Sequence, residues 1–504
     1  MIENIGSRRE LFLDDDLIHS TTARLMLQKP VKRDVCFRFD APHEGNGNLF
    51  PVLIKDNDKY LLYYIAAHRN SEDGKVDYTT KENRDNYPLY ACCIESQDGI
   101  NWTRPSIGAV EVNGSTDNNI VLYKADLDNF VPFIDDNPHC PPDERFKAIE
   151  ANRKVPFDYS MRRKLYRFKS ADGYQWKPMS DEPLSVPGNF DSSNLAFWDA
   201  ERQKYWAYVR NFHKISVDDT SDEANEDAVD DTGEGIRDIR WCESTDFQNW
   251  SEPELLDFEG GLDIPLYVSA VTPYYRAPHI FLGFPARYVE RKHWSPAFDQ
   301  MSDPEHRKNR MLHHPRYGLA ITDCLLMSSR DGKRWRRSDD AYLTPGITSD
   351  HNWVYGDCFL TIGMQETKSD TVGEPNEISM YAFENNWKDQ CLLRRYTIRQ
   401  DGFMSLRADA VGHETLTKPF TFEGGQLTLN VSTSAVGGMK VELQDISGKT
   451  IPGYSLEECD EIFGDRLDYI VSWNGKYDVS PLVGQAIRMR FFMKDVDLYS
   501  FKFD

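Results

Sequence analysis

Short apolar runs separated by polar turns fill most of the chain, and no long helical period interrupts them. The first unit shows the pattern clearly. Residues 48–54 and 59–65 are apolar runs on either side of a polar turn at 55–58, which is the signature of a β-hairpin. A polar loop at 69–87 then leads to another such run at 90–95. The pattern therefore predicts antiparallel strands that are joined in sequence.

A heptad of the pattern Ser-x-Asp-Gly-x-x-Trp follows four of these units. Its copies begin at Ser96, Ser170, Ser244 and Ser329, in steps of 74 (170 − 96), 74 (244 − 170) and 85 (329 − 244) residues, and Phe247 replaces the glycine in the third copy. Aspartate accepts hydrogen bonds from backbone N–H groups two residues on, and glycine supplies positive φ. We expect a structural turn whose tryptophan begins the next strand, so the heptads count repeating units.

A fifth unit follows the fourth heptad. It has apolar runs at 357–363, 377–382 and 393–398, and it ends at 399–403, where the turn residues survive without tryptophan. The order of hairpin, loop, strand, turn and strand thus occurs five times. This predicts a five-bladed β-propeller.

The pattern of apolar and polar residues changes after about residue 410. Strictly alternating runs follow, at 424–431, 439–443, 469–473, 486–493 and 498–503, and they are typical of a β-sandwich. The predicted fold class is therefore all-β, with a catalytic five-bladed propeller at 1–410 and a C-terminal β-sandwich at 411–504.

Composition narrows the range of partners. The formal net charge of −23 (59 − 82) argues against nucleic acid or an anionic membrane as a partner, and no apolar run reaches the roughly 18 residues of a membrane span. The first residues lack the apolar core of a signal peptide, which predicts a cytoplasmic location, or secretion if the chain was trimmed.

Nine cysteines without a Cys-x-x-Cys pair favour neither a disulfide scaffold nor a zinc site. No metal and no cofactor is expected, and we interpret the acidic stretch 217–234 as a solvated loop.

Candidate chemistry comes from the residues that precede each expected inner strand, because such residues converge at one end of a propeller. Carboxylates at three or more of these points suit cleavage of a glycosidic bond, which needs one carboxylate and one carboxylic acid. The predicted catalytic residues are Glu44, Asp135 and Asp191. The predicted substrate-binding residues are His43, Asn46, Asp136, Asn194, Arg210, Tyr267, Trp353, Tyr355 and Asp357.

With these residues the chain resembles the five-bladed glycosidases, the superfamily that contains glycoside hydrolase families 32, 43 and 117, and its layout is most similar to family 32. The first-blade Asn-Asp-Pro-Asn-Gly of that family falls on 43–47, its Arg-Asp-Pro on 134–136 and its Glu-Cys-Pro-Asp on 191–194. The resemblance implies that Glu44 is the nucleophile, that Asp135 binds sugar hydroxyls and stabilises the transition state, and that Asp191 is the acid. An acid needs a raised pKa.

A second resemblance covers nearly the whole chain. The segment 9–15, Arg-Glu-Leu-Phe-Leu-Asp-Asp, together with 44–47 and 137–145, is similar to a group of uncharacterised bacterial glycosyl hydrolases that open with Arg-Glu-Leu-Phe-x-Asp-Asp. This group implies no particular substrate.

The leading hypothesis is a glycoside hydrolase that cleaves a terminal sugar, on family analogy a furanoside, from an oligosaccharide. The chain departs from the family 32 motifs: Glu44 stands in place of aspartate, the arginine before Asp135 is lost, and Asp191 stands in place of glutamate. These departures motivate a second hypothesis, a non-catalytic carbohydrate-binding propeller. A third hypothesis, a glycoside phosphorylase, needs a basic site for phosphate. The sequence leaves the oligomeric state open between monomer and homo-oligomer.

Overall fold

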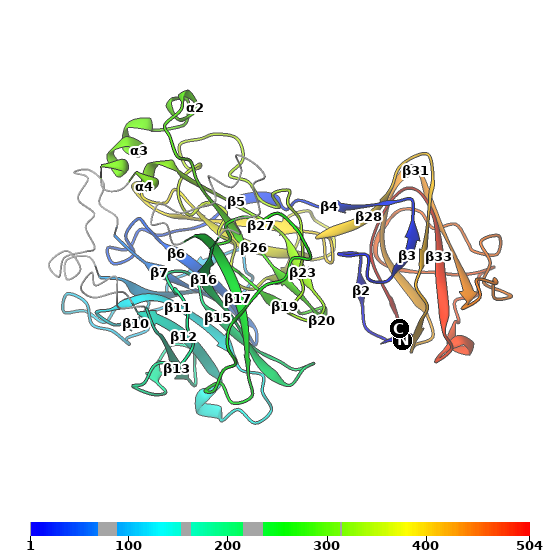
Figure 1. Ribbon diagram of the computed structural model, residues 1–504, viewed down its shortest axis with the longest axis horizontal. Helices are drawn as coiled ribbons and strands as arrows, with labels where there is room; N and C mark the ends of the chain where they lie inside the picture. The colour runs from blue at the N-terminus through cyan, green and yellow to red at the C-terminus, as the bar shows by residue number, and fades with distance from the viewer. Residues whose placement is uncertain (1, 69–87, 153–162, 215–234, 313–314) are drawn as a thin grey trace. The chain divides into compact units, whose positions relative to one another are not determined.

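The computed structural model describes residues 2–68, 88–152, 163–214, 235–312 and 315–504 (Figure 1). The chain forms two compact units. The propeller unit comprises Pro30–Pro273 and His279–Thr397, and the sandwich unit comprises Met1–Lys29, Tyr274–Pro278 and Ile398–Asp504. The polar loop expected at 69–87 and the acidic stretch expected at 217–234 lie outside the described residues.

Five antiparallel blades make up the propeller unit, and this confirms the predicted number; blade four is formed by two sheets and each other blade by one. Each sheet has its strands in nearly sequential order. Blade one is β6 (Leu49–Asp56), β7 (Lys59–Ala66), β8 (Tyr90–Ser96), β9 (Trp102–Thr103) and β10 (Ile120–Tyr123); blade two is β11 (Leu127–Ile134), β12 (Phe146–Asn152), β13 (Leu165–Ser170) and β14 (Lys177–Pro178); blade three is β15 (Leu195–Asp199), β16 (Lys204–His213), β17 (Ile236–Ser244) and β18 (Glu254–Leu255).

Blade four is built from broken strands. Its sheet is β19 (Thr272–Tyr274), β20 (Ala277–Gly283), β23 (Met327–Ser329) and β24 (Arg336–Arg337), and its two central strands continue as the pair β21 (Ala286–Glu290) and β22 (Ala320–Cys324). Between β21 and β22 lie the short helices α2 (Pro296–Asp299), α3 (Pro304–Met311) and α4 (Arg316–Leu319). A 3₁₀ turn, η1 (Pro142–Glu144), precedes β12 in blade two.

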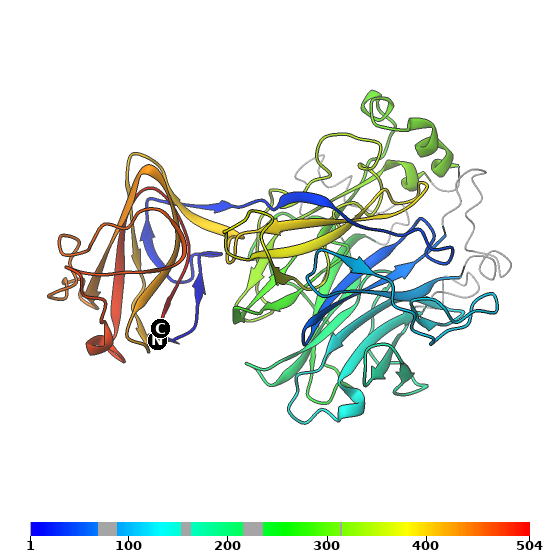
Figure 2. The same ribbon diagram turned by 180° about the vertical axis from the view of Figure 1, so that it is seen from behind.

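Blade five is closed by a strand from the other end of the chain. It consists of β25 (Gln365–Thr367), β26 (Glu377–Glu384), β27 (Leu392–Ile398) and β5 (Val31–Arg38). β5 pairs antiparallel with β27, and Arg38 lies opposite Leu392; Figure 2 shows this blue strand beside the yellow strands of the blade. Closing a ring of sheets in this way leaves no open blade edge at the join.

The blades pack through aromatic side chains that the alternating strands present. Between blades one and five, the ring of Phe39 lies 4.8 Å from Tyr64 and 5.2 Å from Phe383, both in edge-on geometry. All three side chains belong to one buried cluster. Pairs of this kind contribute about 0.5–1.5 kcal/mol beyond their buried area, so the high aromatic content of the sequence serves blade packing.

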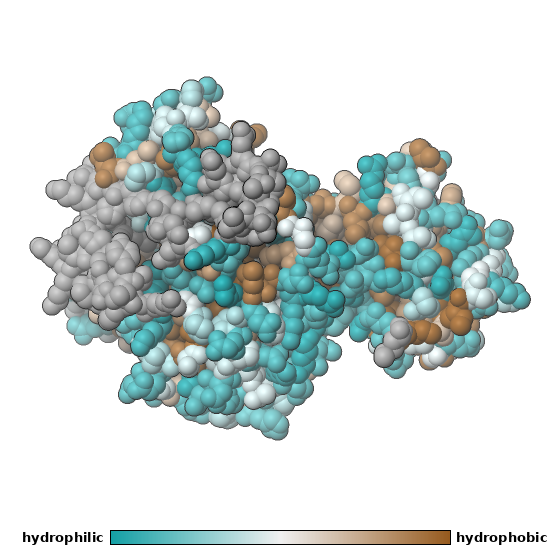
Figure 3. Space-filling model, viewed as in Figure 1, coloured by the Kyte–Doolittle hydropathy of each residue, from teal (hydrophilic) through white to brown (hydrophobic). Residues whose placement is uncertain are grey.

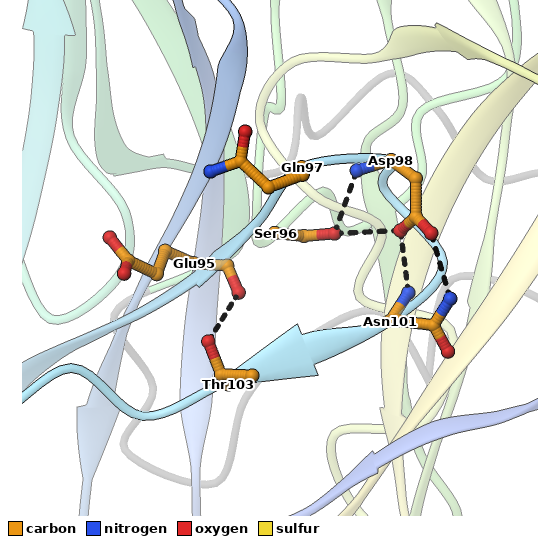
Figure 4. A pocket seen from close by; sticks show the side chains of 6 residues that line it. All are labelled: Glu95, Ser96, Gln97, Asp98, Asn101 and Thr103. Atoms are coloured by element: carbon orange, nitrogen blue, oxygen red, sulfur yellow. Dashed lines mark hydrogen bonds between the residues drawn. The ribbon is translucent and has the colours of Figure 1, made fainter.

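The heptads form the structural turns that the sequence predicts. In the first copy Ser96 Oγ donates to Asp98 Oδ1, which accepts from the N–H groups of Ile100 at 2.8 Å and Asn101 at 2.7 Å. The same pattern recurs at Asp172, Asp246 and Asp331. Ser96, Asp98 and Asn101, which line the hollow at the first turn, bind one another, and Thr103 donates to the Glu95 carbonyl (Figure 4). This turn is therefore a structural element rather than a candidate site.

The sandwich unit is one highly bent sheet of ten strands around a single core. Its long strands β31 (Leu427–Asp445) and β33 (Ile487–Phe503) pair along most of their length, and their register shifts between Thr433 and Gly438; bulges of this kind let strands pass between layers. Both ends of the chain supply the other strands: β1 (Glu3–Gly6), β2 (Glu10–Leu11), β3 (Ile18–Thr21), β4 (Arg24–Leu27), β28 (Met404–Ala408), β29 (His413–Thr417), β30 (Phe420–Phe422) and β32 (Asp465–Ile470). A 3₁₀ turn, η2 (Ser480–Leu482), precedes β33.

The two units divide the chain differently from the domains expected at 1–410 and 411–504. Residues 1–29 join the sandwich unit because their strands find partners there: β1 pairs with β30, β2 with β33, and β4 with β28. The 9–15 motif lies in this region. Arg9 contacts Asp401 at 3.0 Å, and Tyr274 OH donates to the same carboxylate at 2.6 Å. The motif arginine thus neutralises a buried carboxylate of the sandwich unit.

The exposed surface is mainly polar. On the face drawn in Figure 3, hydrophilic residues cover most of the coloured surface and apolar residues are scattered among them, as expected of a chain with 28% charged residues. Within the described ranges, no helix has the length and apolar character needed to cross a membrane.

Candidate functional site

The inner strands of the propeller begin at one end, which we call the proximal end. β6 runs parallel to the inner segment of blade five, since Leu53 N–H donates to the Ile362 carbonyl at 2.8 Å and Ile362 N–H donates to Pro51 at 2.9 Å. β11 packs beside both β6 and β15. Because blades repeat in one orientation around the axis, residues that precede the inner strands gather at the proximal end, and residues that follow them gather at the distal end.

Hydrogen bonds join the proximal segments of neighbouring blades. Asn129 Nδ2 of blade two donates to the Phe190 carbonyl at 3.0 Å, and Ser192 Oγ of blade three donates to the Tyr267 carbonyl at 2.7 Å. Asn46 of blade one donates to the carbonyl of Lys388. These bonds fix the relative positions of side chains that come from different blades.

Two carboxylates and two guanidiniums form an arginine–carboxylate cluster at the proximal end, consisting of Asp128, Arg163, Asp191 and Arg210. Arg163 lies 2.8 Å from Asp128 Oδ2 and 3.3 Å from Asp191 Oδ2, so one guanidinium holds both acids together. Arg210 forms an ion pair with Asp191 Oδ1. The Asp191 side chain keeps 30% of its surface exposed and Asp128 keeps 16%, although Asp191 Oδ1 and Asp128 Oδ2 are themselves buried.

Local structure sets the position of each member. Asp128 lies near the start of β11, and Asp191 precedes β15. Arg210 lies near the end of β16, which runs antiparallel to β15, and its own N–H donates to Asn194 Oδ1 at 3.1 Å. The Tyr267 hydroxyl donates to the Asp191 carbonyl at 2.8 Å. The predicted residues Asp191, Asn194, Arg210 and Tyr267 are therefore brought together.

Asp191 is held in its ionised form. Burial acts to raise its pKa, but the guanidiniums of Arg210, Arg163, Arg237 and Arg316 outweigh burial, and the net pKa lies below the usual value. This direction is opposite to the one that the expected acid role needs. A carboxylate that stays ionised is suited to act as a base or a nucleophile.

A second ion pair lies beside the cluster. Arg237, at the start of β17, contacts Glu290 at 2.8 Å, and both side chains are buried. The Arg237 guanidinium also lies 4.3 Å from the Tyr288 ring centroid, and the Arg210 guanidinium lies 4.1 Å from that of Phe212. Stacking on rings orients guanidiniums that are largely removed from water.

An aromatic group from blades four and five lies next to these arginines. Tyr267 and Tyr288 are 5.5 Å apart, Tyr288 and Tyr355 are 5.8 Å apart, and Tyr355 lies 5.3 Å from Trp387. The Tyr355 hydroxyl is 3.4 Å from that of Tyr267. Sugar rings have apolar faces that stack on such side chains, so the predicted residues Tyr267 and Tyr355 lie where sugar contact is expected.

The remaining blade-five predictions have structural roles. Asp357 is buried, and its Oδ2 accepts the Val354 N–H at 3.1 Å. Burial raises the pKa of Asp357 to about 7, so a large share of its carboxyl groups is neutral near pH 7. Trp353 has φ of 61° and its indole N–H donates to the Gly346 carbonyl at 2.9 Å, which fixes the loop that precedes the inner strand.

The interior of blade one, rather than the cluster, holds Glu44. Glu44 is fully buried; its carboxylate accepts from Tyr64 OH at 2.5 Å and lies 2.8 Å from Arg104. His43 Nε2 pairs with Asn119 Oδ1 at 2.6 Å in the same network. Asn46 donates to the Lys388 carbonyl. The three predicted residues of blade one therefore form structural contacts between strands and between blades.

Asp135 and Asp136 lie at the distal end. The inner strand of blade two is β11, which ends at Ile134, so both residues follow the inner strand where the sequence analysis expected them to precede it. Asp135 contacts Lys147 at 2.5 Å and accepts from Tyr205 OH at 2.7 Å. Burial followed by the charge of Asp135 raises the pKa of Asp136. These acids are separated from the proximal cluster by the length of a strand.

Sequence reasoning missed Asp128 and Arg163. Pro132 in the middle of 127–134 weighs against a central strand, which hid β11. The spacing to the heptad is the signal that was available: the inner strand starts 47 residues before the heptad in blade one (96 − 49), 49 in blade three (244 − 195) and 43 in blade two if it begins at Leu127 (170 − 127). No motif marks Arg163, Glu290 or Arg316.

The described part of the chain contains no group of three or more His, Cys, Asp or Glu side chains arranged to hold a metal ion. The two acids of the arginine–carboxylate cluster form ion pairs with guanidiniums.

No protein-family model and no curated protein sequence matches the chain. Among solved structures, similar ones include a glycoside hydrolase family 32 β-fructofuranosidase from Bombyx mori (8% identity, 95% of this chain and 94% of that one, TM-score 0.40) and a fructofuranosidase from Schwanniomyces occidentalis (11% identity, 99% and 98%, TM-score 0.38). Another is a member of the GH130 family of mannoside phosphorylases, which contains hydrolases of β-1,2 mannosidic linkages in Candida mannan (10% identity, 78% and 96%, TM-score 0.38). Likenesses of this size assign no residue and no reaction to this chain.

Proposed function

We propose that the protein is a glycoside hydrolase that removes a terminal sugar, a furanoside in the leading version, from an oligosaccharide at the proximal end of the propeller. The observation that carries the proposal is the pair of carboxylates, Asp128 and Asp191, that contact one guanidinium beside a group of tyrosine rings. Two nearby carboxyl groups are the minimum that glycosidic cleavage requires.

The environments of the acids suggest their roles. Asp191, with its lowered pKa, acts as the base or the nucleophile. Asp128 is then the proton donor to the leaving oxygen, because Glu290, the other carboxylate nearby, is buried and paired with Arg237. Arg163 bridges both acids, and a substrate that displaces it from Asp128 would raise the pKa of that carboxyl group. Tyr267 and Tyr355 would contact the sugar ring.

A hydrolysis screen tests this proposal. Aryl furanosides, aryl pyranosides and natural oligosaccharides would be incubated with the wild type and with the Asp191→Asn, Asp128→Asn and Asp135→Asn variants. We expect turnover of one substrate class, a loss of ~10³-fold or more in the first two variants, and near-normal turnover by folded Asp135→Asn protein, whose changed carboxylate is distal. Equal losses in all three variants would contradict the assignment of the site.

The four guanidiniums around Asp191 favour a second candidate, a glycoside phosphorylase, since phosphate needs a basic site. Release of sugar phosphate only when phosphate is present would establish it. Sugar binding without turnover, with or without phosphate, would instead establish a carbohydrate-binding propeller.

A further inference from the structure

Arg310 on α3 is a buried guanidinium without a hydrogen-bond acceptor. The residue is 3% exposed, and within the described ranges none of its three side-chain nitrogens has a hydrogen-bond partner. Its guanidinium lies 5.1 Å from the ring centroid of Trp387, and the charged groups near it are Arg307, Asp357 and Asp303. A buried charge without hydrogen bonds is strongly unfavourable, so this arginine is poised for an acceptor.

The neighbouring Arg307 shows how a structural arginine differs. Arg307 lies one helical turn before Arg310 and is equally buried, but its guanidinium donates to the carbonyls of Gly318, at 2.9 Å, and Trp353. Neither arginine has a carboxylate within ion-pair distance in the described part of the chain. Both terminal nitrogens of Arg307 thus have carbonyl acceptors and only its Nε has none, whereas all three side-chain nitrogens of Arg310 lack an acceptor.

Arg310 adjoins the candidate site through the aromatic group. Trp387 lies 5.3 Å from Tyr355, which is 5.8 Å from Tyr288, and Arg237 lies over the other side of this group at 4.3 Å from the Tyr288 ring. A continuous series of ring contacts therefore connects the surroundings of Asp191 with Arg310.

Guanidinium groups are concentrated in this part of the propeller unit, although the whole chain carries −23. Arg163, Arg210, Arg237 and Arg316 act on Asp191. Asp128, Asp191 and Glu290 form ion pairs with arginines, and the acidic groups near Arg310 are Asp303 and Asp357. The carboxyl group of Asp357, with a pKa of about 7, supplies only part of a charge.

We propose that Arg310 is the main contact of an oxyanion-binding site at the proximal end, which takes an anionic group of the ligand, either a sugar carboxylate or a phosphate. Guanidinium groups bind both oxyanions through paired, charge-assisted hydrogen bonds. A neutral sugar hydroxyl would leave the buried charge uncompensated. The inference rests on the proposed function only in taking the ligand to be a carbohydrate or its phosphate co-substrate.

The test measures binding without turnover. Thermal unfolding and calorimetric titration of the full chain would be carried out with galacturonate, glucuronate, inorganic phosphate and, as the neutral control, galactose, all at constant ionic strength. We expect at least one oxyanion to bind and raise the unfolding midpoint, and galactose alone to have the smaller effect. Binding of the sugar acids alone identifies an acidic sugar, and binding of phosphate alone identifies phosphate.

Three variants separate ligand binding from a structural role. Arg310→Gln should weaken oxyanion binding by tenfold or more and, because it removes an uncompensated charge, should raise the unfolding midpoint of the free protein by about 2–4 °C. Arg310→Lys should retain part of the binding. Arg334→Gln, at a residue whose side chain is 67% exposed, is the control and should change neither quantity.

Two results would overturn the inference: no oxyanion binds the wild type, or Arg310→Gln lowers the midpoint and leaves binding intact. The proposed hydrolase can fail separately. If Asp191→Asn retains turnover while Arg310→Gln loses oxyanion binding, the catalytic assignment is wrong and the oxyanion site stands.

Discussion

Arg163 Nε lies 2.8 Å from Asp128 Oδ2, so an arginine that directly precedes β13 neutralises an aspartate of β11 in the same blade. The same guanidinium reaches Asp191 of the next blade at 3.3 Å. The contact thus couples the ionisation of two acids from different blades, and it can be tested by titration.

Replacing Arg163 should lower stability above about pH 4 and make it less dependent on pH in acid. Asp191 has a lowered folded-state pKa, so its ionised form contributes stability above its ordinary value of 3.8, and this contribution is lost as pH falls through the folded-state pKa. Arg163→Gln removes one cause of the lowered pKa and should reduce the contribution. Unfolding midpoints between pH 3 and 6 would measure the effect, and curves of identical shape for both proteins would contradict it.

Glu44→Gln should act on stability rather than on chemistry. The Glu44 carboxylate is buried and bound by Arg104 and Tyr64, and breaking this pair leaves Arg104 with the exposed carboxylate of Asp40 alone as an ion-pair partner among the described residues. Arg104 keeps 29% of its side chain exposed, so we expect a loss of about 2 kcal/mol in the free energy of unfolding, less than for a fully buried pair.

The matched control for Glu44 is Asp40→Asn. Asp40 binds the same arginine at 2.6 Å but is 61% exposed, so its loss should cost about 0–1 kcal/mol. Urea unfolding of both variants measures the two losses in the free energy of unfolding. Turnover is measured per folded molecule. A Glu44→Gln protein with normal stability and no turnover would show that Glu44 is an active-site residue.

Asp357→Asn should flatten the pH dependence of stability. The folded-state pKa of Asp357 is raised to about 7 by burial, so the folded protein holds this proton more tightly than the unfolded chain does. Wild-type stability should therefore fall as pH rises from 3.8 to 7, by at most about 4 kcal/mol.

Asparagine cannot ionise and still accepts the Val354 N–H. Relative to Asp357→Asn, the wild type should thus lose stability up to about pH 7 and then remain parallel. Chemical denaturation at several values between pH 5 and 8 measures the difference. Parallel curves throughout would mean that Asp357 titrates normally.

We expect the side chain of Phe247 to stabilise the third heptad, although its backbone has an unfavourable positive φ. It has φ of 60°, where the other copies have glycine, but it is fully buried and its ring lies 5.3 Å from Tyr205 and 5.5 Å from Phe133. Losing such a ring costs about 3–5 kcal/mol, and removing a strained side chain returns about 1 kcal/mol.

We therefore expect Phe247→Gly to lose about 2–4 kcal/mol and Phe247→Ala to lose about 1 kcal/mol more. The difference between the two variants isolates the backbone strain. A Phe247→Gly protein as stable as the wild type would show that the ring contributes little.

The sequence was sufficient to predict five blades because the heptads are local. The bonds from Asp98 to the N–H groups of Ile100 and Asn101 form within one turn, and any chain with these residues can make them. The assignment of residues 1–29 failed for the opposite reason. Their strands take partners such as β30 and β33 from the far end of the chain, and alternation alone names no partner.

The candidate site was predicted only in part. Asp191, Asn194, Arg210, Tyr267 and Tyr355 lie together as expected, and in blade three β15 begins at Leu195, where the apolar run begins. Glu44 is adjacent in sequence to the proximal end, but Arg104 and Tyr64 draw its carboxylate into blade one. Asp135 was misplaced because an inner strand that contains Pro132 was not recognised. The direction in which a carboxylate side chain points depends on arginines that are distant in sequence. No local sequence pattern identifies these arginines.

The closure of blade five by β5 has a consequence for synthesis of the chain. Arg38 leaves the ribosome 354 residues before its partner Leu392 (392 − 38), and Glu10 waits longer still for Phe501. Each unit therefore stays incomplete until a strand distant in sequence has been synthesised, and residues 1–38 wait without their partners until then. Removing residues 1–38 would therefore leave two unfinished units, an open ring and a sandwich without its first strands.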